Sequence, residues 1–256
     1  MIELPAMPPV QMQAWHVLLD LAEVDTAHWL LVGGQMVYVH AAEAGAALPR
    51  QTVDVDVVVD VIAKPDATTW FSTWLINSGF VLDGMSPDGI GHRFVKDAES
   101  GPGKVIVDIL APDNLGPRAR LTTSPPARTI EARGTRQALK RAEVVDVAVV
   151  GAFGRGKRTG RVRRPNLLGA ILVKAAAFSI PVRPGRERDL QDAAVLLACA
   201  QDPIALRAEL DAGTKGDRKS ARRLTPMLDS KHPAWRPLRP DERGAGQTAL
   251  SLLLEN

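Results

Sequence analysis

The sequence predicts an α+β fold: a mixed, twisted sheet with flanking helices, followed by a C-terminal helical domain. Short apolar strand patterns alternate with helical periodicity up to about residue 164, and only helical periodicity follows. The chain has 256 residues, of which 45% are hydrophobic and 24% charged, so it is long enough for a substantial core. We therefore expect a sheet-containing domain over residues 1–164 and a helical domain over residues 165–256.

The elements of the first half are predicted from the spacing of apolar residues and from glycines and prolines at element ends. Apolar residues three and four apart predict helices, valine-rich or alternating runs predict strands, and Gly33, Pro65 and Gly79 mark element ends. The predicted helices are 11–24, 35–47 and 65–79, and the predicted strands are 29–32, 52–60, 92–95, 104–110 and 143–150.

The second half begins after a strongly basic stretch, residues 151–164, that predicts a loop. Helical spacing then predicts helices over 165–178, 187–200, 203–211, 220–228 and 248–254. The Pro- and Arg-rich residues 233–246 predict irregular structure.

Two aspartates interrupt the most apolar strand pattern of the chain. Asp54 and Asp56 are two residues apart, so they share one face of the strand, with their backbone positions roughly 6 to 7 Å apart. Two like charges on a valine-rich strand are costly unless a cation lies between them. Hard divalent cations prefer such oxygen ligands, so the pair predicts a Mg²⁺ site that Mn²⁺ can also occupy.

A third carboxylate, Asp108, follows the apolar run at 105–107. If that strand lies beside the strand of Asp54 and Asp56, all three carboxylates converge, as two-metal phosphoryl or nucleotidyl transfer requires. The alternative is that Asp108 only caps the end of its strand. The Gly33–Gly34 pair lies between a strand and a helix, where a backbone without Cβ admits phosphate oxygens, or it is simply a tight turn.

A lone lysine, Lys174, lies in an otherwise apolar helical run. A buried ammonium needs an anion, either a triphosphate or a carboxylate, unless the side chain reaches solvent. Asp189 and Asp192 share a face of the next helix. Asp189 suits a helix-capping role, whereas Asp192 is placed to pair with Lys174 or Arg188.

Charge is divided unevenly along the chain. Residues 1–128 hold eight Lys and Arg against fifteen Asp and Glu, and residues 129–256 hold twenty-four against fourteen. The basic half suits a polyanion or is a solubility feature, and Arg161, Arg163 and Arg164 are candidate RNA contacts. The single Cys199 excludes an intramolecular disulfide, and no apolar run is long enough to span a membrane. We expect a cytoplasmic protein.

Taken in order, these motifs resemble those of the polymerase-β-type nucleotidyltransferases. They are Gly33-Gly34-Gln35, then Arg50-x-Thr52-x-Asp54-x-Asp56, then Asp108, and finally the Lys174 and Asp192 helices. The pattern is most similar to the AbiEii/MenT branch, whose members are toxins of toxin–antitoxin systems. In the wider superfamily Gly-Ser stands where this chain has Gly33-Gly34, so Gln35 or Thr52 would have to replace the serine contact.

The resemblance implies a nucleotidyltransferase fold and a Mg²⁺-dependent transfer of a nucleoside monophosphate from an NTP to an acceptor hydroxyl. It points to a tRNA 3′ end as acceptor, with protein and small-molecule hydroxyls left open, and to a cognate antitoxin as partner. It assigns metal binding to Asp54, Asp56 and Asp108, catalysis to these three with Lys174 and Asp192, and nucleotide binding to Gly33, Gly34, Gln35, Arg50, Thr52 and Lys174.

Two other functions remain open from the sequence. One is an antibiotic-modifying nucleotidyltransferase, against which the basic second half counts mildly, because cationic antibiotics favour acidic clefts. The other is a catalytically silent protein that binds RNA or a partner. Three retained carboxylates without a cation would be costly, which counts against a silent fold.

Overall fold

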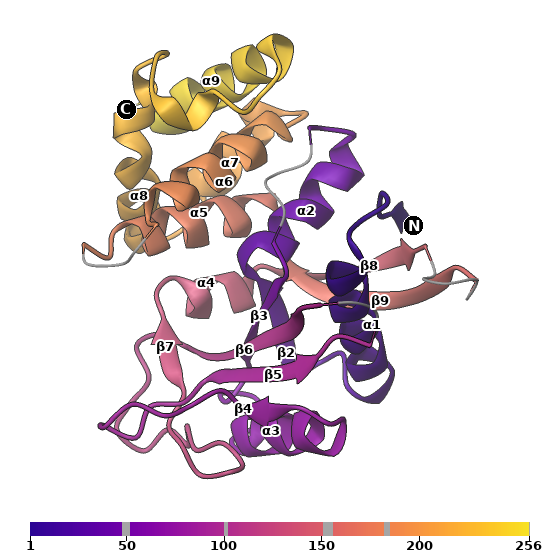
Figure 1. The fold of residues 1–256 in the computed structure, drawn as a ribbon. Coiled ribbons are helices and arrows are strands. Elements are labelled where there is room, and N and C mark those ends of the chain that lie inside the picture. Colours follow the sequence, from indigo (N-terminus) through magenta and orange to yellow (C-terminus); the bar gives the residue numbers. More distant parts are fainter. Residues whose placement is uncertain (48–51, 100–101, 151–155, 182–184, 256) are drawn as a thin grey trace.

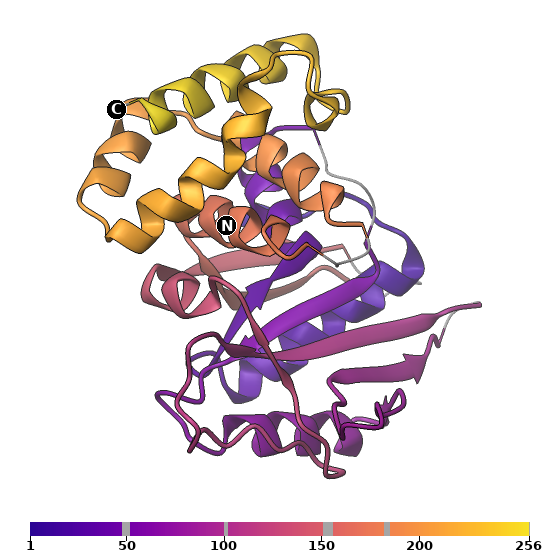
Figure 2. The same ribbon diagram turned by 90° about the vertical axis from the view of Figure 1, so that its left-hand side faces the viewer.

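The protein consists of a sheet-containing part and a helical part packed on one another (Figure 1). A computed structural model describes residues 1–47, 52–99, 102–150, 156–181 and 185–255. All strands within this range end by Pro165, and the residues described beyond it form helices and connections. Figure 2, turned by 90°, shows the same separation, with the helices stacked over one side of the sheets. The division into two domains at residue 164 stays a prediction.

The sheet-containing part has thirteen described elements. They are β1 (Ile2–Glu3), α1 (Pro9–Val24), β2 (Trp29–Val32), α2 (Gly33–Ala44), β3 (Asp54–Val59), α3 (Ala67–Asn77), β4 (Val81–Leu82), β5 (Arg93–Asp97), β6 (Lys104–Pro112), β7 (Ile130–Ala132), α4 (Thr135–Lys140), β8 (Ala142–Val149) and β9 (Arg158–Pro165).

The strands form two sheets. The larger has the order β2-β3-β6-β5-β4, with β7 paired to β6, and the smaller has the order β1-β8-β9. β3 and β6 are parallel, whereas β2 and β5 run antiparallel to their neighbours β3 and β6. This mixed arrangement, flanked by helices, confirms the predicted α+β class. It also confirms that the strands carrying Asp56 and Asp108 lie side by side.

The helical part contains seven described elements. They are α5 (Leu167–Phe178), α6 (Glu187–Ala198), α7 (Pro203–Asp211), α8 (Lys215–Ala221), the 3₁₀ helices η1 (Arg222–Leu228) and η2 (Pro233–Trp235), and α9 (Pro240–Leu254).

Two predicted segments were wrong. Residues 158–165 form strand β9 rather than a loop, because their main chain pairs along the whole of β8, from Ala142↔Pro165 to Val149↔Arg158. Residues 240–247 belong to α9 rather than to an irregular segment. Pro240 occupies a first-turn position, where its missing N–H costs nothing, and Glu242 closes a capping box. The short β1, β4, β7, α4, α8 and η2 were not predicted, and the helix predicted over 220–228 is mostly the 3₁₀ helix η1.

One hydrophobic core runs through both parts. It joins Trp15 and Trp29 of the sheet-containing part to Leu172, Trp235 and Leu250 of the helical part. Ion pairs cross the same junction. Arg141, which precedes β8, forms ion pairs with Glu209 of α7 at 3.2 Å and with Asp217 of α8 at 2.9 Å.

His40 of α2 is part of this junction. Its side chain is buried and its Nε2 lies 3.1 Å from the carbonyl oxygen of Pro165, so Nε2 carries the proton and donates it. Burial, together with the nearby Arg164 guanidinium, lowers the pKa of His40 from 6.5 to about 3. His40 is therefore a packed neutral histidine.

We expect His40 to make the fold sensitive to acid. Below pH 6.5 the unfolded chain binds a proton at this residue and the folded chain does not, so stability is complete above that pH and is lost as the pH falls towards 3. The slope is at most about 1.4 kcal/mol per pH unit. Urea unfolding at pH 7.5 and 5.5 should show a larger loss for the wild type than for His40→Gln. Equal losses would contradict a depressed pKa.

Within the described ranges, no helix combines the length and the apolar character needed to cross a membrane.

Candidate active site

Three aspartates share one face of the larger sheet. Asp54 and Asp56 are two residues apart on β3, and Asp56 is the register partner of Asp108 on the parallel strand β6. Register partners on adjacent strands point to the same face and lie roughly 4.8 Å apart. Asp108 is buried, whereas the Asp54 side chain keeps 37% of its surface exposed. The three carboxylates therefore line one face of the sheet, from the buried Asp108 to the partly exposed Asp54.

Arg93 joins this group from β5, where it is the register partner of Asp108. Its Nε and Nη2 donate to the two carboxylate oxygens of Asp108 at 2.9 and 2.8 Å, a two-point ion pair. The same Nη2 lies 3.6 Å from Oδ2 of Asp54. The hydrogen bond to Asp108 and the charges of Asp108, Asp54 and Asp56 raise the pKa of Arg93 above its ordinary value. Arg93 is thus fixed as a cation among the carboxylates.

The sequence did not single out Arg93. It stands at the start of a short strand, and only the pairing of β5 with β6 places it opposite Asp108. Residues 93–97, Arg-Phe-Val-Lys-Asp, carry no pattern that marks Arg93 as a site residue.

The Gly33–Gly34 turn packs directly against the aspartate strand. Gly33 has a φ of +69°, and a Cβ built there would lie 1.8 Å from Oδ2 of Asp56. A Cβ at Gly34 would lie 2.6 Å from Cγ2 of Thr52. The turn leaves the first N–H groups of α2 beside the Asp56 carboxylate. Glycine is required here both by backbone conformation and by this close approach.

We expect Gly33→Ala to be far more damaging than Gly45→Ala. Both glycines have left-handed backbones, with φ of +69° and +65°, at opposite ends of α2, but a Cβ at Gly45 meets nothing within 4 Å. Backbone strain costs each variant about 1–2 kcal/mol. Only Gly33→Ala must also displace Asp56. Chemical unfolding measures the loss of stability in both variants, and equal losses would mean that the Asp56 side chain moves aside at no energetic cost.

The other predicted nucleotide-binding residues have different surroundings. Gln35 is fully buried: its Oε1 accepts from Gln11 at 3.2 Å and from Trp15 at 2.9 Å, and its Nε2 donates to the Thr52 carbonyl at 2.7 Å. Gln35 therefore anchors the chain that leads into β3. Thr52 is half-buried beside Gly34, and Arg50 lies outside the described residues. Between Gln35 and Thr52, Thr52 is thus the better placed to replace a serine contact.

Lys174 belongs to a second group, on α5 and α6. Its Nζ lies 2.7 Å from Oδ2 of Asp192 and 4.0 Å from Oδ1 of Asp189, and all three side chains are buried. Of the two partners predicted for Asp192, the structure selects Lys174. The ammonium of Lys174 thus lies between the carboxylates of Asp192 and Asp189.

The three arginines proposed as RNA contacts do not form one surface. Arg164 is buried, pairing with Glu43 and, at 3.1 Å, with Glu143. Arg163 lies 3.5 Å from Asp60, at the end of β3 opposite to Asp54, and donates to the Ala27 carbonyl. Only Arg161 is exposed. Strand β9 turns alternate residues to opposite faces, so Arg161 and Arg163 share one face and Arg164 lies on the other. Their role as RNA contacts stays a prediction.

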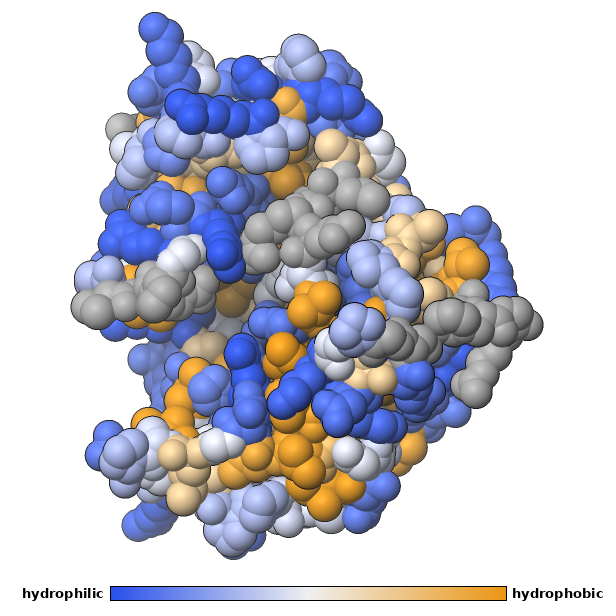
Figure 3. All heavy atoms as spheres, viewed as in Figure 1, coloured by the Kyte–Doolittle hydropathy of each residue, from blue (hydrophilic) through white to orange (hydrophobic). Residues whose placement is uncertain are grey.

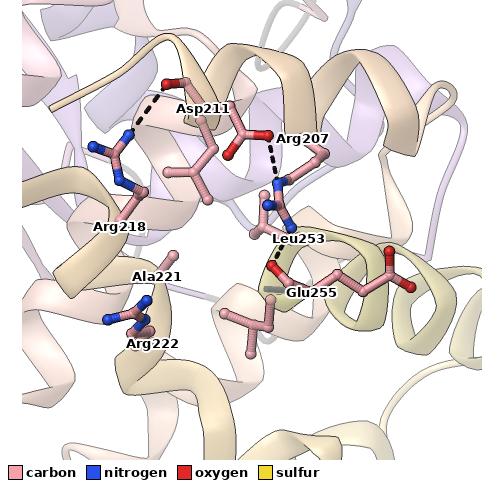
Figure 4. Close-up of a pocket in the computed structure, with 9 residues that line it drawn as sticks. Arg207, Asp211, Arg218, Ala221, Arg222, Leu253 and Glu255 are labelled. Atoms are coloured by element: carbon pink, nitrogen blue, oxygen red, sulfur yellow. Dashed lines mark hydrogen bonds and ion pairs between the residues drawn. The ribbon is translucent and has the colours of Figure 1, made fainter. Parts of the chain in front are cut away.

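A pocket between α7, α8 and α9 contains another group of arginines (Figure 4). Arg207 donates to the Leu252 carbonyl at 3.0 Å and to Asp211 at 2.7 Å, and Arg218 donates to the carbonyls of Asp211 and Gly213. These contacts satisfy carbonyls at the ends of helices. We assign them a structural role.

The donor chemistry at the aspartate face suits a divalent cation. All candidate ligands are carboxylate oxygens, the set preferred by Mg²⁺ and Mn²⁺. Within the described part of the chain, however, no three acidic, histidine or cysteine side chains are gathered as a ready-made metal cage. The Arg93 guanidinium is in contact with Asp108 and close to Asp54. Figure 3 shows that the surface is hollowed between the helical and sheet-containing parts.

Comparison with known proteins gives one informative match. No family model matches the chain, and no curated protein matches it in sequence. A solved structure described as an antigenic nucleotidyltransferase-like protein from Paracoccidioides brasiliensis superposes with a TM-score of 0.52 at 12% identity, covering 97% of this chain and 94% of that one. The chain therefore has the fold of a nucleotidyltransferase-like protein.

Proposed function

We propose that the protein is a nucleotidyltransferase that moves a nucleoside monophosphate from an NTP to an acceptor hydroxyl. The observation that carries the proposal is the register of β3 and β6, which sets Asp56 beside Asp108 with Asp54 on the same face. The Gly33–Gly34 turn places the N-terminus of α2 next to these carboxylates, and helix N-termini favour phosphate oxygens. The nucleotidyltransferase-like fold supports the same activity.

Each residue has a role in this proposal. Asp54, Asp56 and Asp108 would hold Mg²⁺, which supplies charge neutralisation at the phosphates when bound. Asp108 also takes the proton of the acceptor hydroxyl as the oxygen of that hydroxyl attacks the α-phosphorus. A new O–P bond forms, and the bond to pyrophosphate breaks. Thr52 and the first turn of α2 orient the phosphates, and the buried Lys174–Asp192 pair supports the facing helices.

The acceptor we propose first is the 3′ end of tRNA, with the protein acting as the toxin of a toxin–antitoxin pair. This finer proposal rests on the resemblance of the motifs to the AbiEii/MenT branch. With Arg164 buried and Arg163 paired, it draws no support from these two arginines. A small-molecule hydroxyl, such as that of an antibiotic, is the second candidate. A catalytically silent protein that binds RNA or a partner is the third candidate.

The test is a transfer assay with the purified protein, Mg²⁺ and each of the four α-labelled NTPs. Total RNA, purified tRNA and an aminoglycoside mixture serve as separate acceptors. Label on tRNA that is lost after removal of its 3′ terminal nucleotides supports the first acceptor. Label on the aminoglycosides alone moves the function to antibiotic modification. No transfer with any acceptor and no NTP binding would contradict the proposal.

A further inference from the structure

Arg93 contacts an aspartate on the neighbouring strand and also approaches one on the strand beyond it. Its two-point ion pair with Asp108 would already satisfy a cross-strand position. Yet Nη2 also reaches to 3.6 Å from Asp54, which lies two strands away on β3. The same Nη2 atom therefore contacts Asp108 on β6 and approaches Asp54 on β3. A divalent cation held by the same carboxylates would need the space between them.

The exposure of the group shows which contact can open. The Arg93 side chain is 39% exposed and Asp54 37%, whereas Asp108 is only 8% exposed. The Arg93–Asp54 contact is longer and faces solvent, so it is weak. The Arg93–Asp108 pair is short, two-pronged and largely buried on the Asp108 side, so it holds Asp108 in its orientation.

We propose that Arg93 is a positioning residue that takes the place of a divalent cation between Asp108 and Asp54 in the metal-free protein and opposes metal binding until nucleotide arrives. The inference rests on the metal-binding role of the aspartates in the proposed function. Arg93 neutralises part of their repulsion, so the free protein keeps its fold without a cation. The phosphates of an incoming metal–nucleotide complex offer Arg93 a new anionic partner, and this lowers the cost of releasing Asp54.

The experiment measures Mn²⁺ binding to the full chain without nucleotide, by electron paramagnetic resonance of free Mn²⁺. We expect Arg93→Gln to bind Mn²⁺ about tenfold more tightly than the wild type, equivalent to about 1.4 kcal/mol. Lys96→Gln removes the same charge from the same strand, three residues further on, and should change the affinity by less than about twofold. Adding a non-hydrolysable NTP should reduce the difference between wild type and Arg93→Gln.

Two further variants keep the outcomes distinct. Arg93→Lys keeps the charge but loses the two-point geometry, so it should bind Mn²⁺ with intermediate affinity and remains informative if Arg93→Gln does not fold. Asp56→Asn tests the metal site itself. Wild-type Mn²⁺ affinity in Asp56→Asn would contradict the proposed function. Loss of binding in Asp56→Asn, with unchanged or weaker binding in Arg93→Gln and Arg93→Lys, would overturn only the role of Arg93.

Discussion

Asp56→Asn should reduce nucleotidyl transfer by about a thousandfold or more, because a carboxylate that holds the catalytic metal supplies several kcal/mol of transition-state stabilisation. Asparagine has nearly the same shape, so it keeps the packing of residue 56 against Gly33, where Asp56 Oδ2 leaves no room for a Cβ. The variant also removes one of three neighbouring negative charges. Its free energy of unfolding should therefore remain within about 1 kcal/mol of the wild type.

Asp60→Asn is the matched control for this experiment. Asp60 follows the same strand, but at its other end, where it accepts from the Ala63 N–H and lies 3.5 Å from Arg163. Transfer by Asp60→Asn should equal that of the wild type in the labelled-NTP assay. Full transfer by Asp56→Asn would show that the β3 aspartates do not hold the catalytic metal.

Lys174→Met should have the largest effect on stability, about 3 to 5 kcal/mol. The substitution leaves Asp192 and Asp189 buried beside each other with their shared ammonium removed. Breaking a buried pair by removing one partner carries a cost of this size. Lys140→Met, an exposed lysine in α4, should change stability by less than about 0.5 kcal/mol. Urea unfolding at pH 7.5 measures both.

A double-mutant cycle separates a structural role of Lys174 from a nucleotide-binding one. Asp192→Asn removes the negative charge at 2.7 Å from Lys174, so the Lys174→Met/Asp192→Asn protein should lose less stability than the two single variants together. NTP affinity is measured calorimetrically on variants that remain folded. Wild-type stability of Lys174→Met would contradict the buried ion pair, and unchanged NTP affinity would assign Lys174 to the fold alone.

The sequence by itself determined most elements whose patterns are local. Spacing predicted α1, α2, α3, α5, α6 and α7, and apolar runs predicted β2, β3, β6 and β8, since burial of one face is written into three or four consecutive residues. The position of Asp54 and Asp56 on one strand face followed from the period of two. The single lysine of an apolar helix predicted an anionic partner if buried, and Lys174 was one of the two partners predicted for Asp192.

Only the tertiary structure decided what depends on partners far apart in sequence. Strand β9 exists because β8 supplies its hydrogen bonds, and this pairing turned Arg164 into the core and Arg163 towards Asp60. Register set Asp108 beside Asp56 and brought Arg93 opposite Asp108. The burial of a side chain and the partners that it contacts depend on residues far away in the sequence. For that reason, the aspartates could be read from the chain, whereas the arginine that bridges them could not.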